Sequence, residues 1–380
     1  MNIYIISGTF PQMHCGVGDY TYYFCSELKK YNLTLNIITT KNPDVKPLAG
    51  IKIIQLIENW NFLSLFSLLS FFRKNQADII HIQYPTQSYK NKAMINVFPV
   101  FLKIFLPKIH LVVTIHDITT AHIFNKLRAI PFFIFSDKVI LTVVEEKEYL
   151  TRKMPFLRSK LEVISVGSNI KPVELSAEER NRIRQKLGVK EQETLISNFG
   201  YILPKKELAV LLYSLKILNE EGFRAKLIFI SDFSPRTNKY HARLEDLADK
   251  LNIRNLVIWT GYCLEDEVSR YLFSSDVCVE LYNDGVSFRR GSFLAVLSHG
   301  LPIVVNVQKK LPDGLKDGES VITVPVGDAK KLAEAIKKIM ASEELKETLS
   351  SNAKKLSKSF SYEGIAKKHF DLYSLLLKSK

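Results

Sequence analysis

Short runs of β-branched and aliphatic residues alternate with helical patterns along almost the whole chain. Most of these runs are continuously apolar, which is typical of parallel strands that are covered on both faces. Strands are predicted at residues 2–7, 33–39, 51–55, 79–83, 111–115, 138–143, 161–166, 195–199, 225–230, 257–259, 277–280, 302–305 and 321–324. Because helices separate them, the pattern predicts doubly wound α/β sheets.

The strands form two groups, each opened by a strand, a glycine turn and a helix, near Ile3 and near Leu195. Between the groups lies segment 168–176, which contains Pro172 and is interpreted as a linker between two Rossmann-like domains. Ser176 and Glu179 then have the spacing of a helix capping box. Such domains bind ligands at the carboxyl ends of their strands, so the expected site is a cleft between the two sheets.

Composition narrows the class of protein. The 380 residues carry a net charge of +14, and residues 1–171 alone hold 20 Lys/Arg against 11 Asp/Glu. A basic half suits phosphate-bearing ligands, an anionic membrane surface or nucleic acid, and a merely soluble surface is the alternative. The four cysteines contain no C-x-x-C pair, and no apolar run reaches the roughly 18 residues that span a bilayer. With no signal-peptide pattern either, we expect a cytoplasmic protein.

Two segments of the first domain could meet a ligand. Gly16 and Gly18 precede a helix predicted at 20–29, where glycine lets the backbone approach closely and free N–H groups attract anions. An ordinary tight turn is the alternative. His116, followed by Asp117, ends a strongly apolar strand, where its ring could donate to a hydroxyl. A structural histidine is the alternative there, and no second histidine has the spacing of a metal ligand.

The second domain offers two cationic segments. Gly200 to Lys206 connect the first strand to the first helix, and their lysines could neutralise a diphosphate or simply face solvent. Arg289 and Arg290 precede a short apolar helix. Cations at a helix N-terminus cost about 0.3–1 kcal/mol unless an anion compensates, which favours a phosphate-binding interpretation over a solvated pair.

In this order the segments resemble a GT-B glycosyltransferase of the retaining family 4 group, over nearly the entire chain. Gly16 to Gly18 look like the family's glycine loop, and His116 matches its donor-sugar histidine. Lys206 falls on the family's phosphate-binding lysine. Residues 298–302 resemble the Ala-Cys-Gly-Thr-Pro turn, and residues 360–363 resemble the Phe-Ser-Trp opening of the last helix.

The resemblance implies two Rossmann-like doubly wound domains that face each other across a cleft. Residues 1–170 would form the acceptor-side domain and residues 171–360 the nucleotide-sugar-binding domain. The C-terminal helix, within 361–380, would cross back to the first domain.

The chain departs from the family pattern at several positions. Tyr201 replaces an arginine and Glu207 replaces a glycine. The Glu-x7-Glu signature is absent, because Ser287 and Ala295 occupy the positions of its two glutamates. Arg289 and its neighbour Arg290 fall on the Phe-Gly positions near the donor diphosphate, so they are expected to replace the arginine lost at position 201.

The resemblance implies transfer of a sugar from a UDP-, GDP- or similar nucleotide sugar, with retention and without a metal or other cofactor. His116, Lys206, Arg289 and Arg290 form the expected catalytic set. The expected donor-binding residues are Gly16, Gly18, Gly200, Lys206, Asp284, Ser287, Arg289, Arg290 and Ser292. The alternatives are a catalytically silent nucleotide-sugar-binding protein and a nucleotide-sugar epimerase of the same fold. Nucleic-acid binding has only the net charge in its favour.

Two basic, apolar segments of the first domain suggest a membrane surface as a further partner. Residues 61–72 are apolar and precede Arg73 and Lys74. Residues 93–110 carry Phe98, Val100, Phe101, Ile104, Phe105 and Leu106 around Lys90, Lys92, Lys103 and Lys108. Helices of this type dock onto anionic lipid, whereas a buried helix pair with solvated lysines is the alternative. The expected acceptor is therefore a glycan, a lipid-linked intermediate or a small molecule, with a peripheral location at the inner membrane face.

Overall fold

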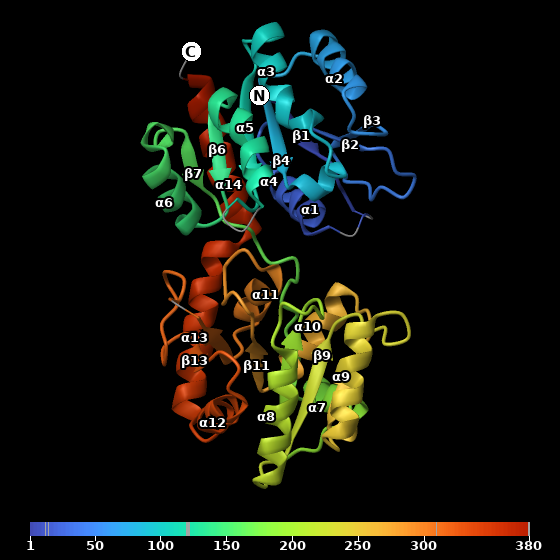
Figure 1. Ribbon diagram of the computed structural model, residues 1–380, viewed down its shortest axis with the longest axis vertical. Coiled ribbons are helices and arrows are strands. Elements are labelled where there is room, and N and C mark those ends of the chain that lie inside the picture. Colours follow the sequence, from blue (N-terminus) through green and yellow to red (C-terminus); the bar gives the residue numbers. More distant parts are fainter. Residues whose placement is uncertain (12, 14, 119–121, 309, 379–380) are drawn as a thin grey trace. The chain divides into compact units, whose positions relative to one another are not determined.

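The computed structural model describes residues 1–378 apart from 12, 14, 119–121 and 309. The chain folds into two compact units (Figure 1). The first unit contains Met1–Gly167 together with Ser361–Lys380, and the second contains Ser168–Phe360. Each unit is built on a parallel sheet flanked by helices, which confirms the predicted α/β fold class. In the part of the chain that is described, no helix is long and apolar enough to cross a membrane.

The sheet of the first unit has seven strands in the order β3-β2-β1-β4-β5-β6-β7. Their bounds are β1 (Asn2–Ser7), β2 (Thr34–Thr40), β3 (Lys52–Ile57), β4 (Ile79–Tyr84), β5 (His110–Ile115), β6 (Lys138–Leu141) and β7 (Leu161–Val163). β1 pairs with β2 on one side and with β4 on the other, so the order reverses there. The carboxyl ends of β1 and β4 are the place where such sheets bind ligands.

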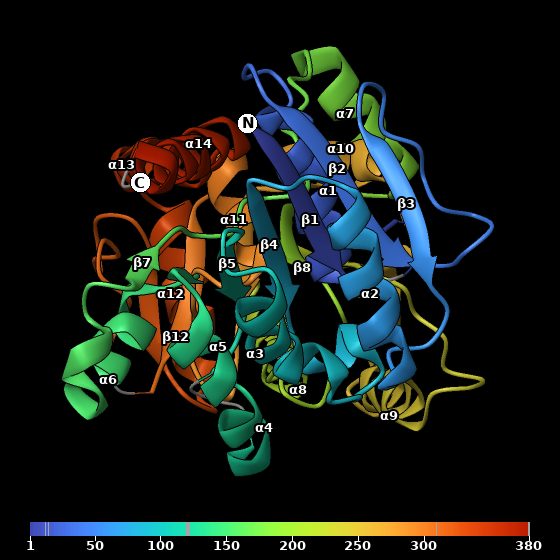
Figure 2. The ribbon, with the colours of Figure 1, turned by 90° about the horizontal axis from the view of Figure 1, so that it is seen from above.

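Alternate side chains of this sheet pack into two apolar cores. Ile3 and Ile5 of β1 join the core under α1 (Gly16–Leu28) and α14 (Tyr362–Lys378). Tyr4 joins the opposite core. That core lies under α2 (Leu63–Lys74), α3 (Met94–Phe105) and α5 (Ile130–Phe135), and Figure 2 shows these helices apart from α14. The C-terminal helix therefore belongs to the first unit, as the expected crossing requires. The remaining helical segments of this unit are η1 (Thr86–Tyr89), α4 (Ile123–Arg128), α6 (Val144–Lys153) and η2 (Pro155–Leu157).

The sheet of the second unit has six strands in the order β10-β9-β8-β11-β12-β13. Their bounds are β8 (Thr194–Phe199), β9 (Ala225–Ile230), β10 (Val257–Trp259), β11 (Val277–Glu280), β12 (Ile303–Val307) and β13 (Ile322–Pro325). Helices α8 (Leu208–Glu220), α9 (Lys239–Lys250) and α12 (Ala329–Met340) cover one core. The other helical segments are α7 (Ala177–Lys186), η3 (Arg254–Leu256), α10 (Glu265–Ser274), α11 (Gly291–His299), α13 (Glu343–Ser357) and η4 (Lys358–Phe360).

The sequence pattern located each of these strands, with ends that differ by at most three residues. The capping box at α7 is formed by Ser176 and Glu179 as predicted. Asp328 likewise accepts a hydrogen bond from the backbone N–H of Lys331 at the start of α12. Residues 168–176, the predicted linker, contain neither helix nor strand.

The start of α1 differs from the prediction. The helix begins at Gly16 and not at residue 20, so Gly16 and Gly18 occupy its first turn. The reason for glycine differs between the two positions. A Cβ on Gly18 would lie 3.3 Å from backbone atoms of Phe10, whereas a Cβ on Gly16 would meet none of the described atoms within 4 Å. Gly18 therefore lets the helix pack against the loop that follows β1.

Candidate functional site

In the second unit, the predicted site residues gather at the carboxyl ends of β8 and β11 and at the start of α11. Gly200 follows β8 with a φ of +95°, a conformation that favours glycine. A Cβ at this position would lie 2.8 Å from the Cβ of Ser292 and 3.6 Å from the Nζ of Lys206. Gly200, Lys206 and Ser292, which are far apart in sequence, therefore come together, and a side chain at position 200 would disrupt this arrangement.

The ammonium group of Lys206 is buried and held by two oxygens. Its Nζ donates to the backbone oxygen of Phe199 at 2.8 Å and lies 3.4 Å from the Oε2 of Glu280. Glu280 is itself fully buried at the end of β11, and its Oε1 accepts from the backbone N–H of Phe199 at 3.1 Å. The lysine that the sequence assigned to phosphate binding thus has a buried carboxylate as its partner.

Tyr282 connects this ion pair to the arginine segment. Its hydroxyl donates to Glu280 and lies 3.2 Å from the Oγ of Ser292. Burial, with Glu280 nearby, raises the pKa of Tyr282 well above its usual value, so the phenol keeps its proton. The guanidinium of Arg290 stacks on the same ring at 3.8 Å from its centroid and forms an ion pair with Asp284.

Arg290 is also the N-cap residue of α11, and its side chain does not cap the helix. The positive end of the helix dipole and a full positive charge therefore lie together, which stabilises a bound anion. The backbone N–H of Arg289 donates to the Oγ of Ser287 at 3.3 Å. This contact fixes the loop before the helix. Of the predicted residues, Asp284, Arg290 and Ser292 thus belong to one cluster with Lys206, and Ser287 and Arg289 lie in the loop beside it.

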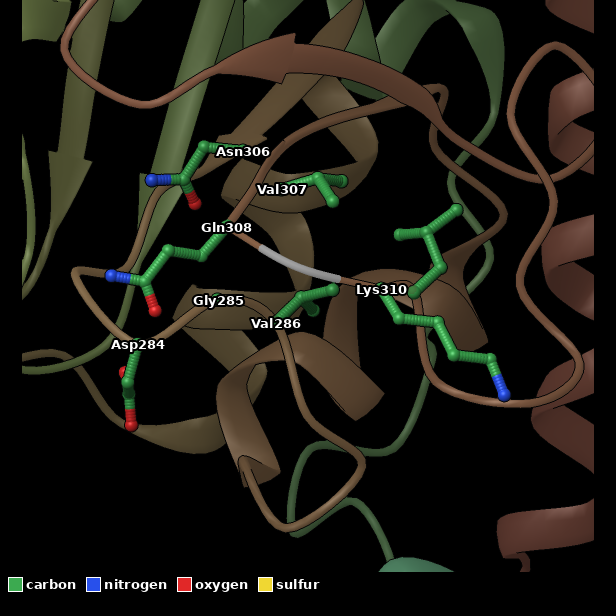
Figure 3. A pocket seen from close by; sticks show the side chains of 8 residues that line it. Asp284, Gly285, Val286, Asn306, Val307, Gln308 and Lys310 are labelled. Atoms are coloured by element: carbon green, nitrogen blue, oxygen red, sulfur yellow. The ribbon is translucent and has the colours of Figure 1, made fainter.

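The departure from the family glycine at position 207 has a structural role. The Oε2 of Glu207 accepts from the Nδ2 of Asn306 at 2.9 Å and from the backbone N–H of Gly327 at 3.2 Å. The same Asn306 bonds both the N–H and the carbonyl of Tyr282. Glu207 therefore holds the ends of β11 and β12 in place. Asn306 and Asp284 also line a small pocket of about 80 Å³ at the end of β12 (Figure 3). Tyr201, where the family has arginine, is exposed.

In the first unit, His116 lies at the carboxyl end of β5 next to the switch point. Its Nε2 lies 2.9 Å from the Oε1 of Gln83, which is buried at the end of β4. The ring of Tyr20, from α1, contacts it edge-on with centroids 5.1 Å apart. Burial, together with the nearby His369, lowers the pKa of His116 to about 3, so its ring is neutral at physiological pH. The first turn of α1, with Gly16 and Gly18, lies at the same edge of the sheet.

Sequence reasoning missed three residues that these contacts single out: Gln83, Glu280 and Tyr282. Each lies at or just after the carboxyl end of a central strand. Glu280 is a polar residue that ends a continuously apolar run, and Gln83 follows an apolar run that only His81 interrupts, so both could have been noticed in the sequence. Tyr282 had no signal in the sequence, because its role depends on contacts with Lys206 and Arg290.

Comparison with known proteins identifies the class. Residues 179–356 match the family model described as "Glycosyl transferases group 1", and residues 15–102 match the model described as "Glycosyl transferase 4-like". An uncharacterized glycosyltransferase of Methanocaldococcus jannaschii is 26% identical over 210 residues, which are 54% of this chain. That match covers 51% of the relative, so the chain spans about half of its length.

Solved structures share the fold over the whole chain. A glycosyltransferase from Rickettsia africae has a TM-score of 0.81 at 17% identity, covering 100% of this chain and 99% of its own. Anabaena HepE in complex with UDP and glucose has a TM-score of 0.75 at 15% identity, covering 98% and 99%. The fold is therefore GT-B. The two matched regions, 179–356 and 15–102, are similar to glycosyltransferases of the family 4-like type.

Proposed function

We propose that this protein transfers a sugar from a nucleoside-diphosphate sugar to an acceptor hydroxyl on a glycan, a lipid-linked molecule or a small molecule. The observation that carries the proposal is the cationic cluster of Lys206 and Arg290 beside the uncapped start of α11. A diphosphate supplies the anion that this arrangement favours. HepE, of the same fold, was solved with UDP-glucose, which supports a nucleotide-sugar donor here.

The protein contributes to this reaction mainly by stabilising the charge of the leaving group and by positioning the reacting groups. The bond between the sugar and the diphosphate breaks, and the diphosphate leaves with the bonding electrons. The acceptor hydroxyl forms the new bond and passes its proton to an oxygen of the leaving diphosphate. Lys206, Arg289 and Arg290 stabilise the departing diphosphate, and His116 orients the sugar. Arg289 and Arg290 provide the positive charge that an arginine at the position of Tyr201 supplies in other members of the family.

Retention of the anomeric configuration and independence of a metal are part of the proposal. Retention follows from the resemblance to the retaining family 4 group. Three cations, Lys206, Arg289 and Arg290, offer the positive charge that a metal ion supplies in other transferases. Gly200, Asp284, Ser287 and Ser292 would then contact the donor through backbone, carboxylate or hydroxyl groups.

The test is thermal unfolding of the full chain with UDP, GDP, ADP and their sugar derivatives. A ligand that binds only the folded state stabilises it by about 2.7 kcal/mol at one hundred times its Kd. We expect one base to raise the melting temperature by several degrees. The shift should be lost in Arg290→Ala and Lys206→Ala and kept in Lys205→Ala, a matched control because Lys205 is exposed.

If none of these compounds shifts the melting temperature, the proposed donor site is wrong. A shift without any transfer or donor hydrolysis would favour the silent binding protein instead. An epimerase would convert the bound nucleotide sugar itself, which product analysis by nuclear magnetic resonance distinguishes from transfer.

We further propose that helices α2 to α5 of the first unit dock onto an anionic phospholipid bilayer. Their exposed large apolar side chains are Phe62, Leu63, Phe66, Ile104, Phe105, Ile123, Phe124, Leu127, Ile130 and Ile134. Residues 61–135 hold eight Lys/Arg against two Asp/Glu, so the surface is basic as well as apolar. Apolar insertion combined with attraction to anionic headgroups is the binding mode of such helices.

A further inference from the structure

A chain of polar side chains crosses the core of the first unit, between His116 and the C-terminal helix. Gln83 and His81 lie on β4, Thr114 lies on β5 and Tyr373 lies on α14. All four are buried among apolar residues. Buried polar groups in apolar surroundings are unfavourable unless they are hydrogen-bonded. Each donor among these four side chains therefore needs an acceptor, which restricts where the protons lie.

The contacts fix the direction of this chain. His116 Nε2 is 2.9 Å from Gln83 Oε1, which can only accept, so His116 carries its proton on Nε2. The amide nitrogen of Gln83 lies 3.4 Å from Nε2 of His81, and Thr114 Oγ1 lies 2.8 Å from the same atom. The amide NH2 of Gln83 can only donate, so Nε2 of His81 accepts, and the Thr114 hydroxyl, which can donate or accept, donates to it.

The far end of the chain agrees with this direction. If Nε2 of neutral His81 accepts, its Nδ1 carries the proton and donates to the hydroxyl of Tyr373, 2.6 Å away. Burial, together with His369 and His116, lowers the pKa of His81 well below its usual value, so the ring is neutral. Every proton in the chain then has one place, and α14 anchors the arrangement through Tyr373.

We infer that Gln83 is a positioning residue that locks His116 in the tautomer protonated at Nε2, so that Nδ1 of His116 accepts a hydrogen bond from a hydroxyl of the donor sugar. This reverses the sequence-based expectation that His116 donates. The inference rests on the proposed function, in which His116 contacts the donor sugar. Gln83 itself acts only through His116.

The first measurement is the ring ¹⁵N spectrum of the full chain labelled at its eight histidines, with His116→Gln used to assign the signals. We expect Nε2 of His116 to be a protonated nitrogen and Nδ1 an unprotonated one. In Gln83→Met the two signals should move toward each other as the tautomers interconvert. In Gln83→Glu, which keeps an acceptor, the lock should remain. Gln87→Met is the matched control, because Gln87 is exposed.

The second measurement is the affinity for UDP-glucose and for UDP, by calorimetry. We expect Gln83→Met to weaken UDP-glucose about tenfold and leave UDP unchanged, because His116 meets the sugar and not the nucleotide. A merely structural role would weaken both ligands together. GDP-mannose with GDP replaces this pair if UDP does not bind.

The outcomes separate the two proposals. A proton on Nδ1 of His116 in the unmodified protein, or no change of tautomer in Gln83→Met, would overturn the lock. If the tautomers of His116 interconvert in Gln83→Met but the ratio of the affinities for UDP-glucose and UDP stays the same, His116 does not contact the sugar. Gln83 would then have no positioning role. The absence of any nucleotide binding would refute the proposed function, while the spectrum would still decide on the lock.

Discussion

The ion pair of Lys206 and Glu280 explains how a single lysine can serve a phosphate site from within the protein. The Nζ of Lys206 lies between the backbone oxygen of Phe199 and the carboxylate of Glu280, and both side chains are almost fully buried. A buried ammonium without a counter-ion would be strongly unfavourable. Glu280 therefore allows Lys206 to be charged at this depth before any anion binds. The hydroxyl of Tyr282 donates to the same carboxylate and so helps to stabilise its negative charge.

Replacing Glu280 should consequently lower stability and increase the benefit of an added anion. We expect Glu280→Gln to lower the free energy of unfolding by about 3 kcal/mol, since removing one partner leaves Lys206 uncompensated. Inorganic diphosphate should then stabilise the variant more than the unmodified protein, because it supplies the missing negative charge. Urea unfolding measures both effects when each protein is compared without diphosphate and at one diphosphate concentration, about ten times the Kd of the unmodified protein. At that concentration the unmodified protein gains about 1.4 kcal/mol, and the variant should gain more.

Glu207→Gln is the matched control for this prediction. Its carboxylate bonds Asn306 and a backbone N–H, and none of the hydrogen bonds that it forms with described residues is to a cation. It should lose less stability and gain nothing extra from diphosphate. If Glu280→Gln unfolds like the unmodified protein, or if diphosphate stabilises both equally, Glu280 does not neutralise Lys206.

At the scale of elements, the sequence was most informative where burial alone decides the structure. Apolar runs, most of them continuous, located the strands of the described residues, because strands covered on both faces have few polar positions to confuse the pattern. Helices α4 and α5 were not predicted, since each has six residues, too few to show a helical period. The early start of α1 was missed because glycine usually signals a turn, and its reason lies in the contact with Phe10.

The candidate site was predictable in part for the same reason. Lys206, Arg290 and Ser292 lie in segments that follow strands of one sheet, so the fold brings them together. The partners of these residues were not predictable. Gln83 and Tyr373 are separated by most of the chain, and only the return of α14 to the first unit places them around His81.

The exposed faces of α2 and α4 permit a direct test of the membrane proposal. Phe66 and Phe124 have 65% and 68% of their surface exposed, so changing them to serine should leave the fold intact. We expect the full chain to co-sediment with phosphatidylglycerol vesicles and to be released by high salt. The double variant Phe66→Ser/Phe124→Ser should bind about tenfold more weakly.

Leu264→Ser is the matched control, because Leu264 is 65% exposed but belongs to the second unit. It should bind the vesicles like the unmodified protein. Equal binding to pure phosphatidylcholine vesicles, or equal losses in the control and the double variant, would contradict docking through these helices.

For the whole molecule, the buried histidines with a lowered pKa are distributed unequally between the two units. Among the described residues, His81, His116 and His369 lie in the first unit, and His299 lies in the second. Burial lowers the pKa of His369 and of His299 to about 4 and that of His116 to about 3, with a lowered pKa also for His81. The nearby Lys368 and Lys354 lower the pKa values of His369 and His299 further.

These shifts make the first unit the more acid-sensitive one. In the unfolded chain the histidines have a pKa of about 6.5, so between pH 7 and pH 5 the unfolded state binds more protons than the folded state. Stability is therefore fully present above about pH 7 and is lost as the pH falls toward the folded pKa values. Each histidine contributes a slope of up to about 1.4 kcal/mol per pH unit, so the slope should be about three times steeper in the first unit.

The two tryptophans allow this difference to be measured in the intact chain. Trp60 is buried in the first unit, and Trp259 stacks on Phe233 in the second. With Trp259→Phe, fluorescence during urea unfolding reports the first unit, and with Trp60→Phe it reports the second. We expect the midpoint of the first unit to fall much more between pH 7 and pH 5. Adding His369→Leu should reduce the slope of the first unit by about one proton. The buried Nε2 of His369 has no hydrogen-bond partner among the described residues, and Nδ1 bonds the backbone oxygen of Ile365 at 2.8 Å, so the substitution removes one hydrogen bond, to the backbone. Equal slopes in the two units would show that these histidines do not control the acid response.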